Sequence, residues 1–228
     1  MNEKQAIPGK PRGRIPLARE GWPFLIPCAA LVAAAAAAAW SVAAALLGVL
    51  LLFMLNFFRD PERATPKEPG LFVSPADGKV VRAEATDEGV FVDIFMNVFD
   101  VHVNRAPMAG RISHMQYTPG RFVNAAAGHA GEVNERNRIE METDDGRNVA
   151  FTQIAGLVAR RIVSYVAVGE HVRAGQRIGM IRFGSRVNCE LPPEFRLAVA
   201  VGDRVRAGES VLARRETGRE GENGGGKR

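Results

Sequence analysis

The sequence has little cysteine and little histidine, and these shortages exclude several classes of protein. Two cysteines and four histidines occur among its 228 residues. Cys28 and Cys189 lie far apart in the chain, which argues against a disulfide framework and fits a reducing compartment. No two histidines are separated by two or four positions and no Cys-x-x-Cys occurs, so a zinc site of the metallopeptidase type lacks its ligands.

An excess of acidic charge is also absent. The chain has 30 Lys and Arg against 25 Asp and Glu, and the resulting net charge of +5 excludes an acidic disordered tail protein. The pI near 9.7 does not indicate nucleic-acid binding, because the basic residues are dispersed or lie beside a long apolar segment. With 46% hydrophobic residues, the chain can form a folded core of ordinary domain size.

An uncharged segment from Gly21 to Phe58 predicts a retained membrane anchor. Its 38 residues exceed the roughly 7 to 15 apolar residues of a secretory signal. One helix of this length would measure about 57 Å against roughly 30 Å of hydrocarbon, so we expect a helical hairpin or re-entrant anchor that turns near Trp40 and Ser41. Both flanks are basic, which predicts that both lie on the cytoplasmic side. The alternative is a buried helical hairpin of a soluble protein.

After this segment the composition changes, and the chain divides into five parts. Short runs rich in Val, Ile and Phe alternate with Gly-containing turns, and no sustained helical period occurs, so the part after residue 70 is expected to be mostly β. The predicted parts are a basic N-terminal segment (1–20), the anchor (21–58), a Pro-containing linker (59–70), a β domain (71–215) and a disordered tail (216–228). The predicted strands lie at 80–81, 90–94, 98–103, 138–142, 149–154, 162–168, 177–181, and around Val205 and Val211.

An internal repeat refines the expected fold. Residues 167–182 (AVGEHVRAGQRIGMIR) align with residues 200–215 (AVGDRVRAGESVLARR), and eight of the sixteen positions are identical. The shared unit is a glycine turn, a strand and a second glycine turn, which resembles the hammerhead half-motif of lipoyl and biotinyl domains. The predicted fold class is therefore mainly β, a barrel-like sandwich with hammerhead half-motifs, preceded by the N-terminal hydrophobic helical anchor.

Few residues suggest chemistry when they are considered one at a time. The apolar even positions from Val90 to Val98 extend by period two to His102, which predicts that this histidine enters from the buried side, either as a catalytic group or as a satisfied core histidine. Asp77 is most simply a turn residue, and Ser185 is most simply a loop serine after a strand. The other histidines, His114, His129 and His171, carry weaker signals, and a solvated turn is favoured for the last of them.

Five short stretches, taken in order, resemble the short membrane-associated bacterial form of the phosphatidylserine decarboxylase family. They are FFRDPER (57–63), SPADG (74–78), FDVHVNRAP (99–107), NERN (134–137) and FGSRV (183–187). Members of this family are self-cleaving proenzymes that depend on a pyruvoyl group. The resemblance covers almost the whole chain, and it implies an enzyme of phospholipid biosynthesis, a carboxy-lyase located at the cytoplasmic face of the cell membrane.

The resemblance also implies a mechanism. The bond between Gly184 and Ser185 would cleave itself by attack of the serine hydroxyl, through an ester and a dehydroalanine, to leave a pyruvoyl group derived from Ser185. The products would be a β chain of residues 1–184 and an α chain of residues 185–228. His102 oriented by Asp77 would act as the base. The pyruvoyl cofactor would then form a Schiff base with phosphatidylserine, lose carbon dioxide and release phosphatidylethanolamine after protonation by His102.

Two positions depart from the family pattern. Longer relatives carry a second histidine three residues after the position of His102, where this chain has Arg105, so it stays open whether one histidine serves both reactions. Asn188 stands where an aspartate is expected after Gly-Ser-Arg-Val. Cys189 is a rival nucleophile, but nothing near it in the sequence suggests a lowered thiol pKa.

A membrane-tethered lipoyl-like adaptor or carrier domain without catalysis is the alternative function. A carrier needs an exposed lysine at its hairpin, and Lys79 is the lysine nearest to a matching turn. Adaptors usually add a long helical hairpin next to the hammerhead halves, and the β region shows none. As partners the sequence predicts phosphatidylserine in the bilayer, the membrane, and the α and β chains for each other. Self-association into a homo-oligomer is compatible with it, and neither a metal nor nucleic acid is expected.

Overall fold

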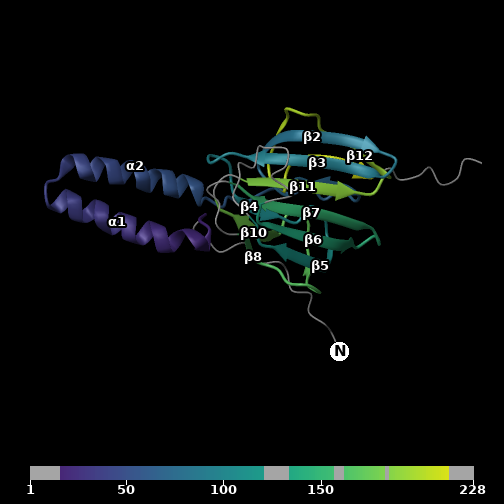
Figure 1. Ribbon diagram of the computed structural model, residues 1–228, viewed down its shortest axis with the longest axis horizontal. Coiled ribbons are helices and arrows are strands. Elements are labelled where there is room, and N and C mark those ends of the chain that lie inside the picture. Colours follow the sequence, from purple (N-terminus) through teal and green to yellow (C-terminus); the bar gives the residue numbers. More distant parts are fainter. Residues whose placement is uncertain (1–15, 121–133, 157–161, 183–184, 216–228) are drawn as a thin grey trace, which may run out of the picture. The chain divides into compact units, whose positions relative to one another are not determined.

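The computed structural model describes residues 16–120, 134–156, 162–182 and 185–215. It forms two compact units, residues 1–62 and 63–228. Among the described residues, the helices lie in the first unit and the strands of the three sheets lie in the second (Figure 1).

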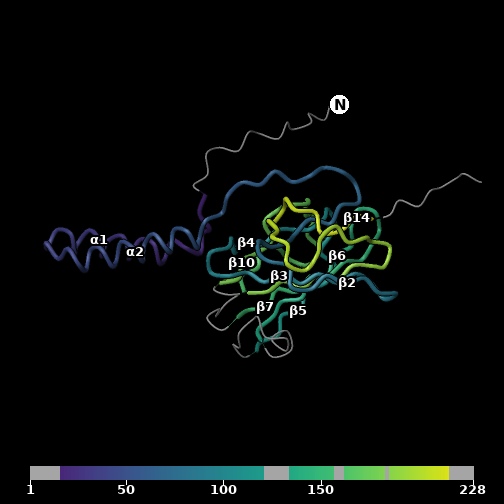
Figure 2. The backbone as a smooth tube through the Cα atoms, turned by 90° about the horizontal axis from the view of Figure 1, so that it is seen from above, coloured from purple at the N-terminus to yellow at the C-terminus, as the bar shows by residue number. Residues whose placement is uncertain are grey.

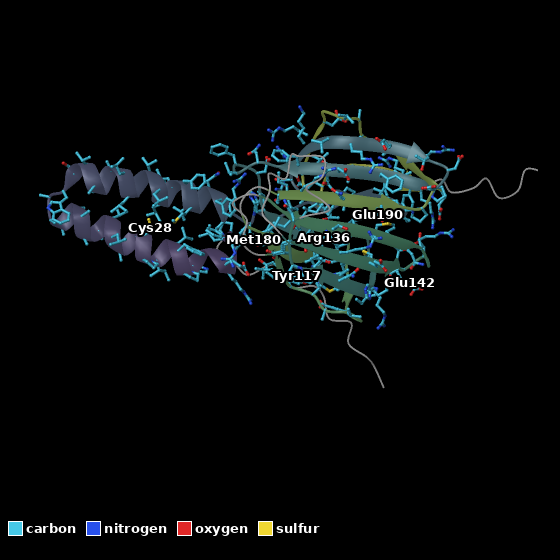
Figure 3. All side chains as sticks on the ribbon, viewed as in Figure 1. Cys28, Tyr117, Arg136, Glu142, Met180 and Glu190 are labelled. Atoms are coloured by element: carbon cyan, nitrogen blue, oxygen red, sulfur yellow. The ribbon has the colours of Figure 1, made fainter. Side chains whose placement is uncertain are left out.

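The helical unit is an antiparallel pair of apolar helices. Helix α1 (Trp22–Ala37) follows a single 3-10 turn, η1 (Arg19–Gly21), and helix α2 (Ser41–Phe57) follows α1 after a turn at residues 38–40. Both helices are rich in Ala and Leu, which favour helix, and their apolar side chains project outward along the pair (Figure 3). Residues 19–37 are long and apolar enough to cross a membrane, whereas α2 is somewhat shorter.

The open end of the hairpin is fastened by backbone hydrogen bonds. The N–H of Ala18 donates to the carbonyl oxygen of Phe58 (2.8 Å), and the N–H of Asp60 donates to the carbonyl oxygen of Pro16 (2.8 Å). Gly21 lies against the Phe58 ring, where a Cβ atom would approach ring carbon at 2.7 Å. The chain therefore enters and leaves this unit at the same end.

The β unit contains fourteen strands among its described residues, in three antiparallel sheets. The largest sheet has the order β13-β2-β3-β11-β7-β6-β5-β9, and two three-stranded sheets have the orders β1-β14-β12 and β4-β10-β8 (Figure 1). The strands are β1 (Leu71–Val73), β2 (Gly78–Thr86), β3 (Gly89–Met96), β4 (Val103–Arg105), β5 (Gly110–Thr118), β6 (Arg136–Thr143), β7 (Asn148–Ala155), β8 (Ile162–Ser164), β9 (His171–Val172), β10 (Arg177–Ile181), β11 (Ser185–Leu191), β12 (Phe195–Leu197), β13 (Arg204–Val205) and β14 (Val211–Arg215).

The core lies on one face of the eight-stranded sheet. Strand β11 alternates between buried residues (185, 187, 189 and 191) and partly exposed ones, and β3 buries its even-numbered positions from 90 to 96. Glu190 is on the opposite face of β11 and binds Arg138 of β6 (Figure 3). Because β11 pairs with β3 and β7 along almost its whole length, its buried residues lie in the middle of the sheet.

The two copies of the sequence repeat fold in the same way. Each begins with a glycine turn and a two-residue strand, β9 or β13, and then passes a second glycine into a five-residue strand, β10 or β14. Gly175 and Gly208 stand at equivalent positions with φ of +76° and +75°, a conformation that glycine adopts without strain. Figure 2 shows the yellow C-terminal segment beside the blue strands early in the unit, as the pairing of β13 with β2 and of β14 with β1 requires.

These observations confirm the mainly β prediction, and they correct some details. The described strands do not close into a barrel. The strand predicted at 98–103 is wrong, because β3 ends at Met96 and a turn follows before β4. Strands β5 and β11 were not predicted, and Ser185, interpreted from the sequence as a loop residue, is the first residue of β11. The predicted tail at 216–228 lies outside the described residues.

Candidate active site

Ser185 occupies a buried position at the start of a central strand. In the register of the sheet it lies opposite Met96 of β3 on one side and Ala155 of β7 on the other. Its side chain has no exposed surface, and its Oγ donates a hydrogen bond to the Sδ atom of Met96 (3.2 Å). A thioether is a weak acceptor, so this hydroxyl is available to a stronger base. Gly184, the other residue of the predicted cleaved bond, lies outside the described residues.

His102 is fully buried in the segment between β3 and β4. Its Nδ1 atom lies 3.0 Å from the carbonyl oxygen of Asp100, and its own carbonyl oxygen accepts from the N–H of Ile181 (3.2 Å). The period-two argument that placed it on the buried side is wrong, since the chain turns after Met96, but the burial that it predicted is present. The side chain of Asp100 instead caps the turn and binds Arg204 (2.9 Å).

Asp77 lies in the tight turn between β1 and β2, and an arginine holds it. Arg63 donates to both carboxylate oxygens (3.0 and 2.7 Å), and the backbone N–H of Ala207 donates to Oδ1 (2.7 Å). Burial raises the pKa of Asp77, while the Ala207 hydrogen bond and the Arg63 charge act in the opposite direction. The Asp77–His102 pair stays a prediction, because the contacts that hold this carboxylate come from Arg63 and Ala207.

Arg63 is a site residue that sequence reasoning missed. In the sequence Arg63 is only one residue of the stretch 57–63 and one of the basic charges after the apolar segment. In the structure its side chain is 8% exposed and also binds Glu209 (3.2 Å). The segment that follows the two helices thus supplies the arginine of a buried ion pair to the turn that carries Asp77.

A line of buried amide side chains, which we call the amide chain, ends beside Ser185. Asn137 Nδ2 donates to Gln153 Oε1 (3.1 Å), Gln153 Nε2 donates to Asn104 Oδ1 (2.8 Å), and Asn104 Nδ2 points to the Met96 sulfur (3.9 Å). The three amides come from β6, β7 and β4 and are at most 4% exposed. Asn104 and Asn137 lie in two of the stretches that resemble the family, but nothing in the sequence shows that they and Gln153 meet.

The end of β7 next to Ser185 is fixed by two further buried residues. Asn134 Nδ2 donates to the carbonyl oxygen of Ala155 (2.7 Å), and the carbonyl oxygen of Glu135 accepts from the N–H of Ala155 (2.9 Å). The carboxylate of Glu135 accepts from the N–H of Ile162 (3.0 Å). These contacts give the 134–137 stretch, selected from the sequence by its resemblance alone, a physical role beside β11.

The remaining histidines do not join this cluster. His114 is exposed on β5, and His171 is exposed on β9 with its Nε2 atom 2.6 Å from Asp144. His129 lies outside the described residues. Among the residues that the structure describes, no three His, Cys, Asp or Glu side chains are grouped to hold a metal ion.

Cys189, the rival nucleophile, and Lys79, the candidate carrier lysine, are both placed unfavourably for these roles. Cys189 is fully buried, and burial raises its pKa well above the ordinary thiol value, which opposes a nucleophilic thiolate. Lys79 lies in β2, where the sheet register pairs it with both Phe95 and Arg204, instead of at the tip of a hairpin as a carrier lysine would. Arg105 is buried and donates to the carbonyl oxygen of Gly175 (2.9 Å).

The residues around Ser185 fit a pyruvoyl group formed in place from that serine. The position is dry, since Ser185 and the Met96 side chain that it contacts are both fully buried, and a reactive ketone would be protected there from bulk water. Such a group needs no dedicated cofactor pocket, because it is part of the backbone of β11. The arrangement is suited to covalent chemistry at the first residue of a strand.

Comparison with known proteins gives consistent matches. A family model described as phosphatidylserine decarboxylase matches residues 50–213. The chain is 45% identical over 206 residues to the phosphatidylserine decarboxylase proenzyme of Desulfotalea psychrophila, which covers 87% of this chain and 96% of that protein. It is 47% identical over 205 residues to the protein of the same description from Symbiobacterium thermophilum, with 87% and 95% covered. The corresponding protein of Burkholderia cenocepacia is 45% identical, with 88% and 96% covered.

Proposed function

This chain belongs to the phosphatidylserine decarboxylase family, and on that premise we propose that it is a self-cleaving proenzyme that converts phosphatidylserine to phosphatidylethanolamine. The observation that carries the proposal is the environment of Ser185. Its hydroxyl is fully buried at the start of a central strand, and its partner among the described residues is a weak one, a sulfur atom. A serine with a purely structural role in such a place would be expected to bind a strong backbone acceptor.

The first reaction is cleavage of the bond between Gly184 and Ser185. Ser185 Oγ attacks the Gly184 carbonyl carbon, and the acyl group moves from nitrogen to oxygen to give an ester. Removal of the Ser185 α-proton then expels the Gly184 carboxylate and leaves a dehydroalanine. Water adds to the corresponding imine, and ammonia departs to leave the pyruvoyl group at the start of the α chain.

A base is required for both the attack and the α-proton removal, and His102 is our candidate. It is buried in the same unit as Ser185, and the contact of its Nδ1 atom with the Asp100 carbonyl oxygen assigns the Nδ1 proton, leaving Nε2 as the basic nitrogen. Asp77 is held by Arg63, which offsets its charge, and by the N–H of Ala207. Its proposed effect is to orient His102.

The second reaction is decarboxylation of the lipid head group. The pyruvoyl group supplies an electrophilic carbonyl for the substrate amine and accepts the electron pair released with carbon dioxide. His102 supplies the proton that replaces the carboxylate. The dry surroundings strengthen each electrostatic contact made by these residues, because the local dielectric is low.

The proposed location is the cytoplasmic face of the cell membrane, with the α1–α2 pair as the anchor. Apolar side chains are exposed on both helices, including Ile26 (62%) and Leu46 (68%), and exposure of this kind is costly in water. The substrate carries its acyl chains in the same bilayer. Retention of the full chain in the membrane fraction after alkaline extraction would support this location, and complete release would refute it.

The test of the function is the intact mass of the purified chain under denaturing conditions, with Ser185→Ala as the matched control. We expect the wild-type protein to give two chains that divide after residue 184. The smaller one should be lighter than the encoded peptide by one ammonia and blocked to Edman sequencing. The Ser185→Ala chain should stay in one piece.

Activity is measured on the same samples with phosphatidylserine in mixed micelles. The cleaved protein should form phosphatidylethanolamine, and treatment with borohydride in the presence of substrate should inactivate it. A folded wild-type preparation that decarboxylates the lipid as one uncut chain would refute the pyruvoyl proposal. An uncut and inactive folded chain would favour the adaptor or carrier function.

A further inference from the structure

We propose that Asn104 takes part in the self-cleavage, by donating a hydrogen bond from Nδ2 to Ser185 Oγ as that oxygen leaves in the elimination step. The inference rests on the proposed function, since it concerns a step of that reaction. It assigns a chemical task to a β4 residue that lies in the stretch 99–107 but to which the sequence gives no role of its own.

The amide chain fixes the direction in which Asn104 presents its groups. Its Oδ1 atom accepts from Gln153 Nε2 (2.8 Å), and Gln153 is itself oriented because its Oε1 atom accepts from Asn137 Nδ2 (3.1 Å). With Oδ1 engaged in this way, the Nδ2 group of Asn104 faces the Met96 sulfur (3.9 Å). Asn104 and Gln153 are fully buried, so water does not compete for these contacts.

Ser185 Oγ and Asn104 Nδ2 therefore approach the same atom. The hydroxyl lies 3.2 Å from the Met96 sulfur and the amide nitrogen lies 3.9 Å from it. A thioether is a poor partner for a buried amide N–H, so among the described residues this donor has only a weak acceptor, and that acceptor is also the partner of Ser185.

The reaction makes Ser185 Oγ a much better acceptor. In the elimination, a base removes the Ser185 α-proton and the C–H electron pair forms the Cα–Cβ double bond. The Cβ–Oγ bond breaks, and its electron pair stays on Oγ, which leaves as part of the Gly184 carboxylate. Negative charge therefore develops on the oxygen that contacts the same sulfur atom as the Asn104 donor, and a hydrogen bond that strengthens in the transition state speeds the step.

Asn104→Asp tests this directly, because it keeps an oxygen for Gln153 and replaces only the donor. We expect elimination to slow by about 100-fold or more, the usual effect of losing one donor to a developing oxyanion. Asn188→Asp is the matched control, since it makes the same change on the opposite face of the strand that carries Ser185. It should cleave at the wild-type rate.

The ester is the specific readout. If elimination is the slowed step, the Asn104→Asp chain should accumulate the ester. Hydroxylamine should then split it into a first chain ending in a hydroxamate and a second chain with a free N-terminal serine. A variant that is simply misfolded gives no such split, and its unfolding temperature would fall well below that of the uncut Ser185→Ala chain.

Gln153→Glu provides a second test without touching Asn104. A glutamate accepts from both neighbouring amides, so Asn104 should turn to donate toward residue 153 and present its oxygen to Ser185, again with trapped ester. Wild-type cleavage by either Asn104→Asp or Gln153→Glu would overturn the inference, and so would slow cleavage of Asn104→Asp without trappable ester. If the wild-type chain itself does not cleave, the proposed function fails first.

Discussion

Replacing Arg63 by methionine should destabilise the β unit in a way that depends on pH. The substitution keeps much of the apolar side-chain volume but removes the two hydrogen bonds and the charge that Asp77 receives. The pair is largely buried, with side-chain exposures of 8% and 12%, so Asp77 would be left as a buried carboxylate supported mainly by the N–H of Ala207. Breaking one side of a buried pair typically costs about 3 to 5 kcal/mol.

The sign of the pH effect follows from the direction of the pKa shift. Burial already raises the pKa of Asp77 above its usual value, and loss of Arg63 removes opposing contributions, so the pKa rises further in the variant. A carboxyl group with a raised pKa binds a proton on folding, and its contribution to stability falls as the pH rises from the unfolded pKa to the folded one. The destabilisation by Arg63→Met should therefore be largest at pH 8 and smaller at pH 4, where protonated Asp77 needs no partner.

Thermal unfolding of uncut chains, all carrying Ser185→Ala, measures this effect. At pH 8 a cost of about 3 kcal/mol corresponds to a fall in Tm of roughly 6 to 12 °C for a chain of this size. Arg204→Met is the control, because Arg204 is exposed where it binds Asp100. Ion pairs of exposed arginines contribute about 1 kcal/mol or less to the free energy of unfolding. Adding Asp77→Asn to Arg63→Met should restore part of the loss at pH 8. Equal losses at pH 4 and pH 8, or no restoration, would refute the reasoning.

Two further substitutions have expected outcomes that separate one physical cause from another. Gly175→Ala should lower Tm considerably more than Gly146→Ala. Both glycines have φ near +76°, but an added Cβ would overlap Thr65 Oγ1 at residue 175 and would meet nothing within 4 Å at residue 146. Equal losses of Tm would leave backbone strain as the common cause. The Cys189→Ser chain should still cleave after residue 184. In the wild-type chain Cys189 should resist a maleimide until the chain is denatured, because its thiol is buried and its pKa is raised. Loss of cleavage in the variant, together with rapid labelling of the native wild-type chain, would make this cysteine the nucleophile.

The repeat allowed much of the fold to be predicted from sequence. Glycine turns with acidic residues at fixed positions produce the same local geometry in both copies, so residues 167–182 and 200–215 could be understood without tertiary information. Strand β5 was harder to detect, because most of its side chains are polar and face solvent. Strand β11 was missed for a related reason, since its buried face begins with a serine and includes a cysteine.

The candidate site could be predicted only in part. Ser185, His102 and Asp77 were selected by resemblance, and their burial is a property of the folded chain that no local pattern specifies. The amide chain joins strands β6, β7 and β4, which meet through sheet register and packing across more than thirty residues of sequence. Arg63 was treated as a flank charge because its sequence neighbours are polar, while its partner belongs to a later turn.

The position of β11 between β3 and β7 affects how the molecule can be assembled. Cleavage before Ser185 would turn a strand from the middle of the large sheet, together with β12 to β14, into a separate polypeptide. Folding of the uncut chain is unimolecular, whereas reassembly of the two pieces would depend on their concentration and would expose unpaired strand edges. The cut protein would not refold readily after denaturation. Its lifetime would therefore depend on a slow rate of unfolding and not on a folding equilibrium. Because β11 lies in the middle of the large sheet, the chain would have to fold before it is cut.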